Sequence, residues 1–164
     1  MELEKPIGHI VCEDVPTLKN MLPFVTKDDL RPAMQNIYFN SRLSATDSHK
    51  LFFKGHKSNL TEQILLDPTC CDLMDASDYE VWKNGQIIFL TDGLEVISFR
   101  RCEESFPEID SVLPNSEDFE KELLVDRKLL ISELKQAKIF TNSITHAVSI
   151  HVDRNWIKIQ CEDL

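Results

Sequence analysis

The feature that most constrains the fold of this chain is a pattern that occurs three times along its 164 residues. Each copy opens on an aspartate before a helical stretch, and extended β-branched or aromatic segments follow. The three aspartates are Asp14, Asp67 and Asp126, spaced 53 and 59 residues apart. Aspartate is a preferred helix N-cap because its carboxylate accepts hydrogen bonds from free N–H groups of the first turn. The pattern predicts a threefold repeat of one strand-helix-strand-strand unit.

Extended segments follow the expected helix in each repeat. They cover residues 34–39, 43–45 and 51–54 in the first repeat, 80–82, 87–90 and 95–99 in the second, and 147–152 and 156–161 in the third. Asn84-Gly85 and Asp92-Gly93 separate the strands of the second repeat. Both dipeptides are strong hairpin signals because they tolerate positive φ.

Apolar spacing predicts one helix per repeat, over about 16–26, 68–77 and 127–140. Pro23 lies inside the first helix and is expected to kink or shorten it. In the third helix, apolar side chains recur at helical spacing and are expected to form its buried stripe. These are Leu130, Leu134 and Ala137. Three lysines then fall together on another face: Lys128, Lys135 and Lys138.

The composition suits a chain that buries a real core, because 42% of its residues are hydrophobic. We find no apolar stretch of signal-peptide or membrane-spanning length, and therefore expect a cytoplasmic chain without membrane contact. The net charge of −10 argues at first against a nucleic-acid partner. However, residues 103–122 alone carry −7, so a locally basic surface elsewhere is compatible with the total.

The sequence contains no catalytic or cofactor signature such as a P-loop, GxGxxG, GxSxG or HExxH motif. We predict no enzyme activity, no cofactor and no bound metal. Asp47 and His49 are competent for a metal or acid–base site, as in a metal-dependent hydrolase, but a tight turn held by Asp47 is the competing interpretation. The five cysteines lack CxxC spacing, and the adjacent pair Cys70 and Cys71 is expected to be buried and reduced.

Several segments resemble the sliding clamp family, specifically the beta subunit of bacterial DNA polymerase III. Members carry a Thr-Asp-Gly-His-Arg-Leu motif, and residues 46–51 here read Thr-Asp-Ser-His-Lys-Leu. The family's Phe-Pro-Asp-Tyr segment ending in Leu-Pro resembles residues 106–114, and its Ile-Leu-Ser-Asn run is similar to residues 139–142. Ser48 replaces the family's glycine, which distorts the turn if positive φ is needed there.

The resemblance implies an α+β DNA clamp fold in which repeated strand-helix-strand-strand units pack helices on antiparallel sheets. It implies a clamp middle-type domain over residues 1–114, a linker over 115–122 and half of a second clamp-type domain over 123–164. The helices would face DNA with a set of cations: Lys19, Lys27, Arg31, Lys128, Lys135 and Lys138. A hydrophobic pocket for partner peptides would be lined by Met34, Thr46, Ser48, His49, Leu51 and Pro114.

The function expected from these features is that of a DNA sliding clamp or clamp-like subunit, a processivity factor in DNA replication. It is expected to encircle duplex DNA without reading base sequence and to dock polymerase and clamp-loader peptides. A family ring contains twelve such repeats, so a homo-oligomer of four chains would supply the same number. The alternative is a clamp-like module or fragment that binds peptides and does not encircle DNA.

Overall fold

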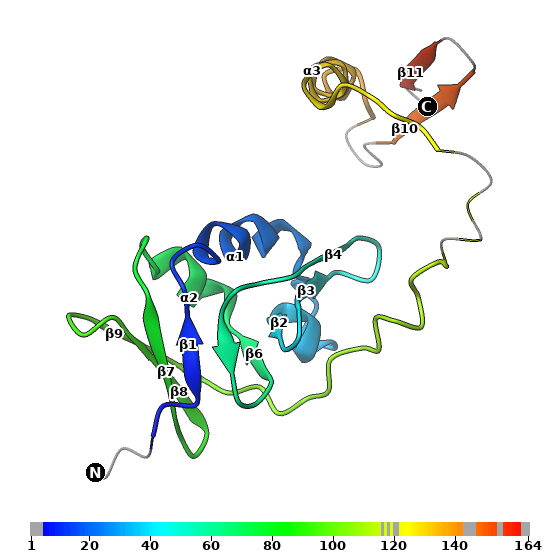
Figure 1. Cartoon of the computed structure of the whole chain (residues 1–164). Helices are drawn as coiled ribbons and strands as arrows, with labels where there is room; N and C mark the ends of the chain where they lie inside the picture. The colour runs from blue at the N-terminus through cyan, green and yellow to red at the C-terminus, as the bar shows by residue number, and fades with distance from the viewer. Residues whose placement is uncertain are drawn as a thin grey trace. The chain divides into compact units, whose positions relative to one another are not determined.

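The computed structural model describes residues 5–115, 117, 119, 122–142, 147–153 and 156–161. The chain divides into two compact units, residues 1–112 and 113–164 (Figure 1). Each unit is described by itself below. The predicted linker over 115–122 lies partly outside the described residues. The assignment of a middle-type domain and a half-domain stays a prediction.

The first unit contains the first two repeats. The first repeat consists of β1 (Gly8–Ile10), α1 (Val15–Met21), the 3-10 turns η1 (Leu22–Phe24) and η2 (Pro32–Gln35), β2 (Ile37–Phe39), β3 (Leu43–Thr46) and β4 (Leu51–Lys54), and the short β5 (Asn59–Leu60) follows. The second repeat consists of β6 (Ile64–Leu66), α2 (Pro68–Leu73), β7 (Tyr79–Asn84), β8 (Ile87–Thr91) and β9 (Val96–Arg100). Both predicted hairpin turns are confirmed, and Gly85 and Gly93 have positive φ.

The two repeats exchange their leading strands. One sheet has the order β5-β1-β7-β8-β9 and the other has the order β4-β3-β2-β6. Strand β1 pairs antiparallel with β7, placing Ile10 opposite Tyr79, and β6 pairs antiparallel with β2, placing Leu66 opposite Ile37. Each sheet therefore contains strands of both repeats, and β1 is seen beside β7 in Figure 1.

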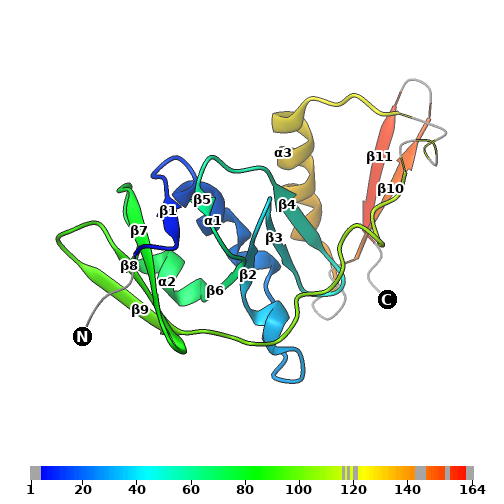
Figure 2. The ribbon, with the colours of Figure 1, turned by 60° about the horizontal axis from the view of Figure 1, so that its bottom comes forward.

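Helices α1 and α2 contact each other, as both ribbon views show (Figure 2). Their side chains Leu18, Met21 and Cys71 are fully buried in one core that includes residues of both sheets. Helix α1 ends at Met21 and Pro23 lies in η1, which confirms the predicted shortening because proline cannot continue an α-helix interior. Helix α2 is also shorter than the predicted 68–77, and residues 34–35 belong to η2 instead of a strand.

Two of the three predicted aspartate caps are confirmed. The side chain of Asp67 accepts a hydrogen bond from Thr69 N, and that of Asp126 accepts one from Leu129 N, both at 2.8 Å. Asp14 precedes α1 but makes no such bond. Its carboxylate accepts from the backbone N–H and hydroxyl of Ser58 instead. The prediction of a cap was wrong here because Asp14 has helical φ and ψ, and its carboxylate binds a segment 44 residues away in the sequence.

The described part of the second unit contains α3 (Arg127–Lys138) and the hairpin of β10 (Val148–Val152) and β11 (Ile157–Cys161). Helix α3 contacts β11. No residue of α3 is buried, so the prediction of a buried stripe was wrong. Its members Leu130, Leu134 and Ala137 are half-buried, since a two-stranded hairpin covers them and the described residues supply no second layer.

Candidate functional site

The motif at residues 46–50 forms a tight turn between β3 and β4. Thr46 Oγ1 donates a hydrogen bond to Lys50 O at 2.8 Å and accepts one from Ser48 N at 3.1 Å. Asp47 Oδ1 accepts from His49 N at 2.9 Å and from Lys50 N at 2.8 Å. These bonds confirm the tight-turn interpretation. Ser48 has φ +76°, so the position where the resembled motif has glycine does require positive φ.

The carboxylate of Asp47 is committed to this turn. Partial burial raises the pKa of Asp47, but the N–H donors of Lys50 and His49 and the Lys50 ammonium outweigh burial and hold the pKa at about 2. Lys50 Nζ lies 3.1 Å from Asp47 Oδ2. Asp47 is therefore ionised at neutral pH and acts as a structural acceptor.

Lys50 holds the turn against η1. Its Nζ donates a hydrogen bond to Pro23 O at 3.2 Å and lies 5.7 Å from the centroid of the Phe24 ring. The ring of Phe24 in turn lies 5.2 Å from that of Phe52 in β4. One lysine thus joins segments 27 residues apart, which fixes the shape of the surface between them.

A hollow of about 520 Å³ lies between this turn and the segment after α1. It brings together Ser48 and His49, predicted to bind peptides, and Lys27 and Arg31, predicted to face DNA. Most lining side chains are polar or charged, in contrast to the expected hydrophobic pocket. The lining residues are Pro23, Val25, Thr26, Lys27, Asp28, Arg31, Asp47, Ser48, His49 and Lys50.

Four residues of the predicted peptide pocket do not line this hollow. Met34 is nearly buried in η2 and its carbonyl accepts a hydrogen bond from Thr26 N. Thr46 turns its hydroxyl into the turn, and Leu51 is half-buried at the start of β4. Pro114 belongs to the second unit. The sequence did not indicate Pro23 or Thr26, because their proximity to the turn depends on the long-range contact of Lys50.

The other predicted DNA-facing cations are exposed. Lys19 lies on α1, and Lys128, Lys135 and Lys138 lie on α3. Lysines exposed on a helix are free to contact phosphates without reading bases.

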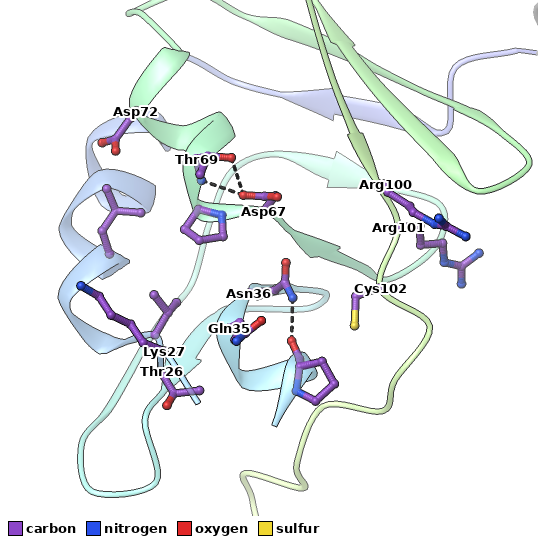
Figure 3. Close-up of a pocket in the computed structure, with 14 residues that line it drawn as sticks. Thr26, Lys27, Gln35, Asn36, Asp67, Thr69, Asp72, Arg100, Arg101 and Cys102 are labelled. Carbon is purple, nitrogen blue, oxygen red and sulfur yellow. Dashed lines mark hydrogen bonds between the residues drawn. The ribbon is translucent and has the colours of Figure 1, made fainter. Parts of the chain in front are cut away.

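A second hollow of about 630 Å³ lies between η2, the start of α2 and the end of β9 (Figure 3). Asp67 faces Thr69 there, and the side chains of Arg100 and Arg101 point away from Asp67. Lys27 lines both hollows. None of the residues predicted for the peptide pocket lines the second one.

Among the described residues, no three His, Cys, Asp or Glu side chains are grouped as metal ligands. The helices in the same part of the chain are all too short or too polar to cross a lipid bilayer.

Two repeats that exchange leading strands and pack two helices on antiparallel sheets define a clamp-type α+β domain. No family model and no curated protein matches the sequence. Among solved structures, the chain has the fold of the bacterial DNA polymerase III beta subunit, the sliding clamp. This confirms both the predicted α+β clamp fold and the resemblance on which it was based.

The agreement extends over nearly the whole chain. The beta subunit from Streptococcus pyogenes has a TM-score of 0.81 and 16% identity and covers 99% of this chain. The clamp from Bacillus subtilis has a TM-score of 0.78 and 13% identity over 97%, and the griselimycin-bound subunit from Bartonella birtlesii has 0.77 and 17% over 97%. The chain spans about half of those proteins, 46–48% of their length.

Proposed function

We propose that this chain is a subunit of a DNA sliding clamp, a ring that encircles duplex DNA and serves as a processivity factor in replication. The observation that supports this most is the clamp fold over 99% of the chain at a TM-score of 0.81. The proposed ring is a homo-oligomer of several copies of this chain. The function is topological and requires neither catalysis nor a cofactor. It places the protein in the cytoplasm beside the replication machinery.

The proposed DNA contact is electrostatic and weak. The exposed lysines of α3 lie on one face of that helix, and Lys19 is exposed on α1. Ammonium groups hold phosphates by charge alone, so the ring slides and its DNA association falls steeply with salt. The net charge of −10 keeps DNA from binding elsewhere on the surface.

The proposed peptide contact is the hollow beside the turn at residues 46–50. His49 and Ser48 supply polar contacts, and Pro23 and Val25 supply a small apolar surface. Lys27 adds a cation, and Arg31 adds a second that is shared with Asp28, since Arg31 Nε lies 3.5 Å from Asp28 Oδ2. The lysine favours a polymerase or clamp-loader peptide with an acidic residue beside its apolar anchor. A polymerase tethered in this way stays at its template through a raised effective concentration.

The decisive experiment uses DNA topology. The chain is incubated with a nicked circular plasmid and a clamp-loading extract and then gel-filtered at moderate salt. A ring remains with the circular DNA and is lost when one cut linearises the plasmid. Retention that is identical on both forms, or absent from both, would contradict encirclement. Replacement of Lys128, Lys135 and Lys138 by serine is expected to reduce retention, whereas replacement of Lys57, Lys83 and Lys158 by serine serves as the charge-matched control.

The second candidate is a peptide-binding module that does not encircle DNA. It is favoured by the position of Lys27 and Arg31, which line the same hollow as His49. A fluorescent peptide with one leucine, one phenylalanine and one glutamate is the probe. His49→Ala is expected to weaken its binding several-fold, while His9→Ala, at an exposed site on β1, leaves it unchanged. Peptide binding without topological DNA retention would select this candidate.

A further inference from the structure

The third repeat exposes side chains whose counterparts in the other two repeats are buried. The third residue after the N-cap position is Thr17 in α1, Cys70 in α2 and Leu129 in α3. Thr17 is 7% exposed and Cys70 is 2% exposed, whereas Leu129 is 61% exposed. At the next position Leu18 is fully buried, and Leu130 is only half-buried. Helix α3 therefore presents the face that α1 and α2 use for the shared core.

In the third repeat, residues 123–125 correspond to the leading strand, and they pair with no strand among the described residues. Ile-Leu-Leu precedes Asp67 and forms β6, which is completely buried against β2. Leu-Leu-Val at residues 123–125 precedes Asp126 and forms no strand, and Leu124 is 96% exposed. Residues 123–125 therefore have no neighbouring strand of the kind that β2 provides for β6.

Strand β10 has one edge that pairs with no other described strand. Its counterparts β2 and β7 each pair on one edge with the next strand of their own repeat and on the other edge with a leading strand from the other repeat. Among the described strands, β10 pairs with β11 alone. The third repeat thus offers one leading segment and can accept one, and the described residues of the second unit contain no other repeat that pairs with it.

The apolar surface left open is large enough for a stable contact. A groove of about 450 Å³ lies between residues 123–125, Leu129 and Trp156. Exposed apolar side chains around it amount to on the order of 500 Å², and one side of a standard interface buries about 800 Å², a little more than half of it apolar. Five of them line the groove: Leu123, Leu124, Leu129, Trp156 and Ile157. The other two, Ile150 and Val152, pair in the hairpin with the lining residues Ile159 and Ile157.

The charge of the second unit permits self-association. Residues 113–164 contain nine acidic and seven basic residues, whereas residues 1–112 contain nineteen and eleven. A nearly neutral unit is not repelled by its own copy, and low net charge favours association.

We propose that the second unit binds the second unit of another copy of this chain, and that each copy adds residues 123–125 to the free edge of β10 in the other. The contact is isologous because each copy gives one strand and receives one. The pairing of β6 with β2 sets the register, with Leu66 opposite Ile37 and Ile64 opposite Phe39. Val125 then lies opposite Val148 of the second copy, and Leu123 lies opposite Ile150. This contact goes beyond the proposed function, because it depends on the exposed surfaces of the third repeat and not on DNA.

The first test is the solution mass of the 164-residue chain by light scattering without DNA. The expected mass is that of a dimer or a multiple of it. Leu129→Asp is expected to raise the dissociation constant at least tenfold, because it places a carboxylate in the apolar contact. Leu73→Asp is the matched control, since Leu73 ends α2 and is 66% exposed. A monomeric wild-type chain, or an equal effect of both variants, would overturn the proposal.

The second test traps the strand exchange. By the same register, Leu124 faces Ser149 of the other copy, as Leu65 faces Tyr38. Leu124→Cys and Ser149→Cys chains are mixed and oxidised, and a disulfide-linked dimer is expected in excess over either variant alone. Leu124→Cys mixed with Ser132→Cys is the control. A dimer without this cross-link would overturn the exchange. Retention on circular DNA tests the clamp function separately, because a ring closed through another contact would be retained without this cross-link.

Discussion

Ser48 and Gly93 occupy the same position in two copies of one turn. Both have positive φ, +76° and +91°. Gly93 N donates to Thr91 Oγ1 at 3.1 Å, and Thr91 Oγ1 donates to Glu95 O at 2.7 Å. The corresponding bonds around Ser48 measure 3.1 and 2.8 Å. Ser48 therefore holds a conformation that glycine adopts freely and other residues adopt at a cost.

Ser48→Gly is expected to stabilise the first unit by about 1 kcal/mol, because it removes the cost of positive φ while the backbone bonds of the turn remain. Urea unfolding followed by circular dichroism measures the free energy. Ser98→Gly, at an exposed position within β9, is the control and is expected to destabilise by roughly 0.5–1 kcal/mol. A loss of stability in Ser48→Gly as large as that of the control would refute the explanation.

Acid is expected to weaken the turn through Asp47. The pKa of Asp47 is lowered to about 2 in the fold, so its carboxylate contributes stability above the unfolded value of about 4 that is lost as pH falls toward 2. Asp47→Asn keeps the acceptor oxygen but does not titrate. Its stability is expected to fall less than that of the wild type between these pH values, by about 1 kcal/mol. Parallel curves for the two proteins would count against this assignment.

Two buried serines are expected to respond to alanine in opposite directions. Among the described side chains, the hydroxyl of Ser44 in β3 is buried without a hydrogen-bond partner. The hydroxyl of Ser58 donates to Asp14 and accepts from Val11 N. Ser44→Ala is expected to stabilise by about 1 kcal/mol and Ser58→Ala to destabilise by about 1–3 kcal/mol. Thermal unfolding of both variants checks the signs, and equal signs would disprove the contrast.

Two cysteine thiols are expected to be inert in the native protein. Burial raises the pKa of Cys70 to about 11 and that of Cys71 to about 12, which leaves almost no reactive thiolate. Cys102, Cys12 and Cys161 are only half-buried. Labelling with iodoacetamide and mass mapping are expected to show modification of these three first, with Cys70 and Cys71 modified after addition of urea. Equal labelling rates for all five would be inconsistent with the buried core.

Local signals in the sequence predicted local structure well. Asn84-Gly85 and Asp92-Gly93 form turns, and Asp67 and Asp126 cap helices. In each case the residue acts on backbone groups within three positions of itself. The clamp fold was predicted from such motifs together with their order along the chain.

Features that depend on distant contacts were not predictable in this way. Asp14 has the same sequence context as a cap but bonds Ser58, 44 residues away. The hollow next to His49 depends on Lys50 reaching Pro23 O, and Leu129 is exposed because the described residues of its unit supply no second layer. No local pattern encodes any of these relationships.

The exchange of leading strands has a consequence for folding. Strand β1 cannot pair with β7 until β7 has been synthesised, because Ile10 pairs with the first residue of β7, 69 positions later. The sheet therefore closes only after most of the first unit has left the ribosome. Pairing between segments far apart in sequence slows folding and makes it cooperative. The two repeats of this unit are therefore expected to appear and disappear together in a single kinetic transition, with no state in which one is folded and the other is not.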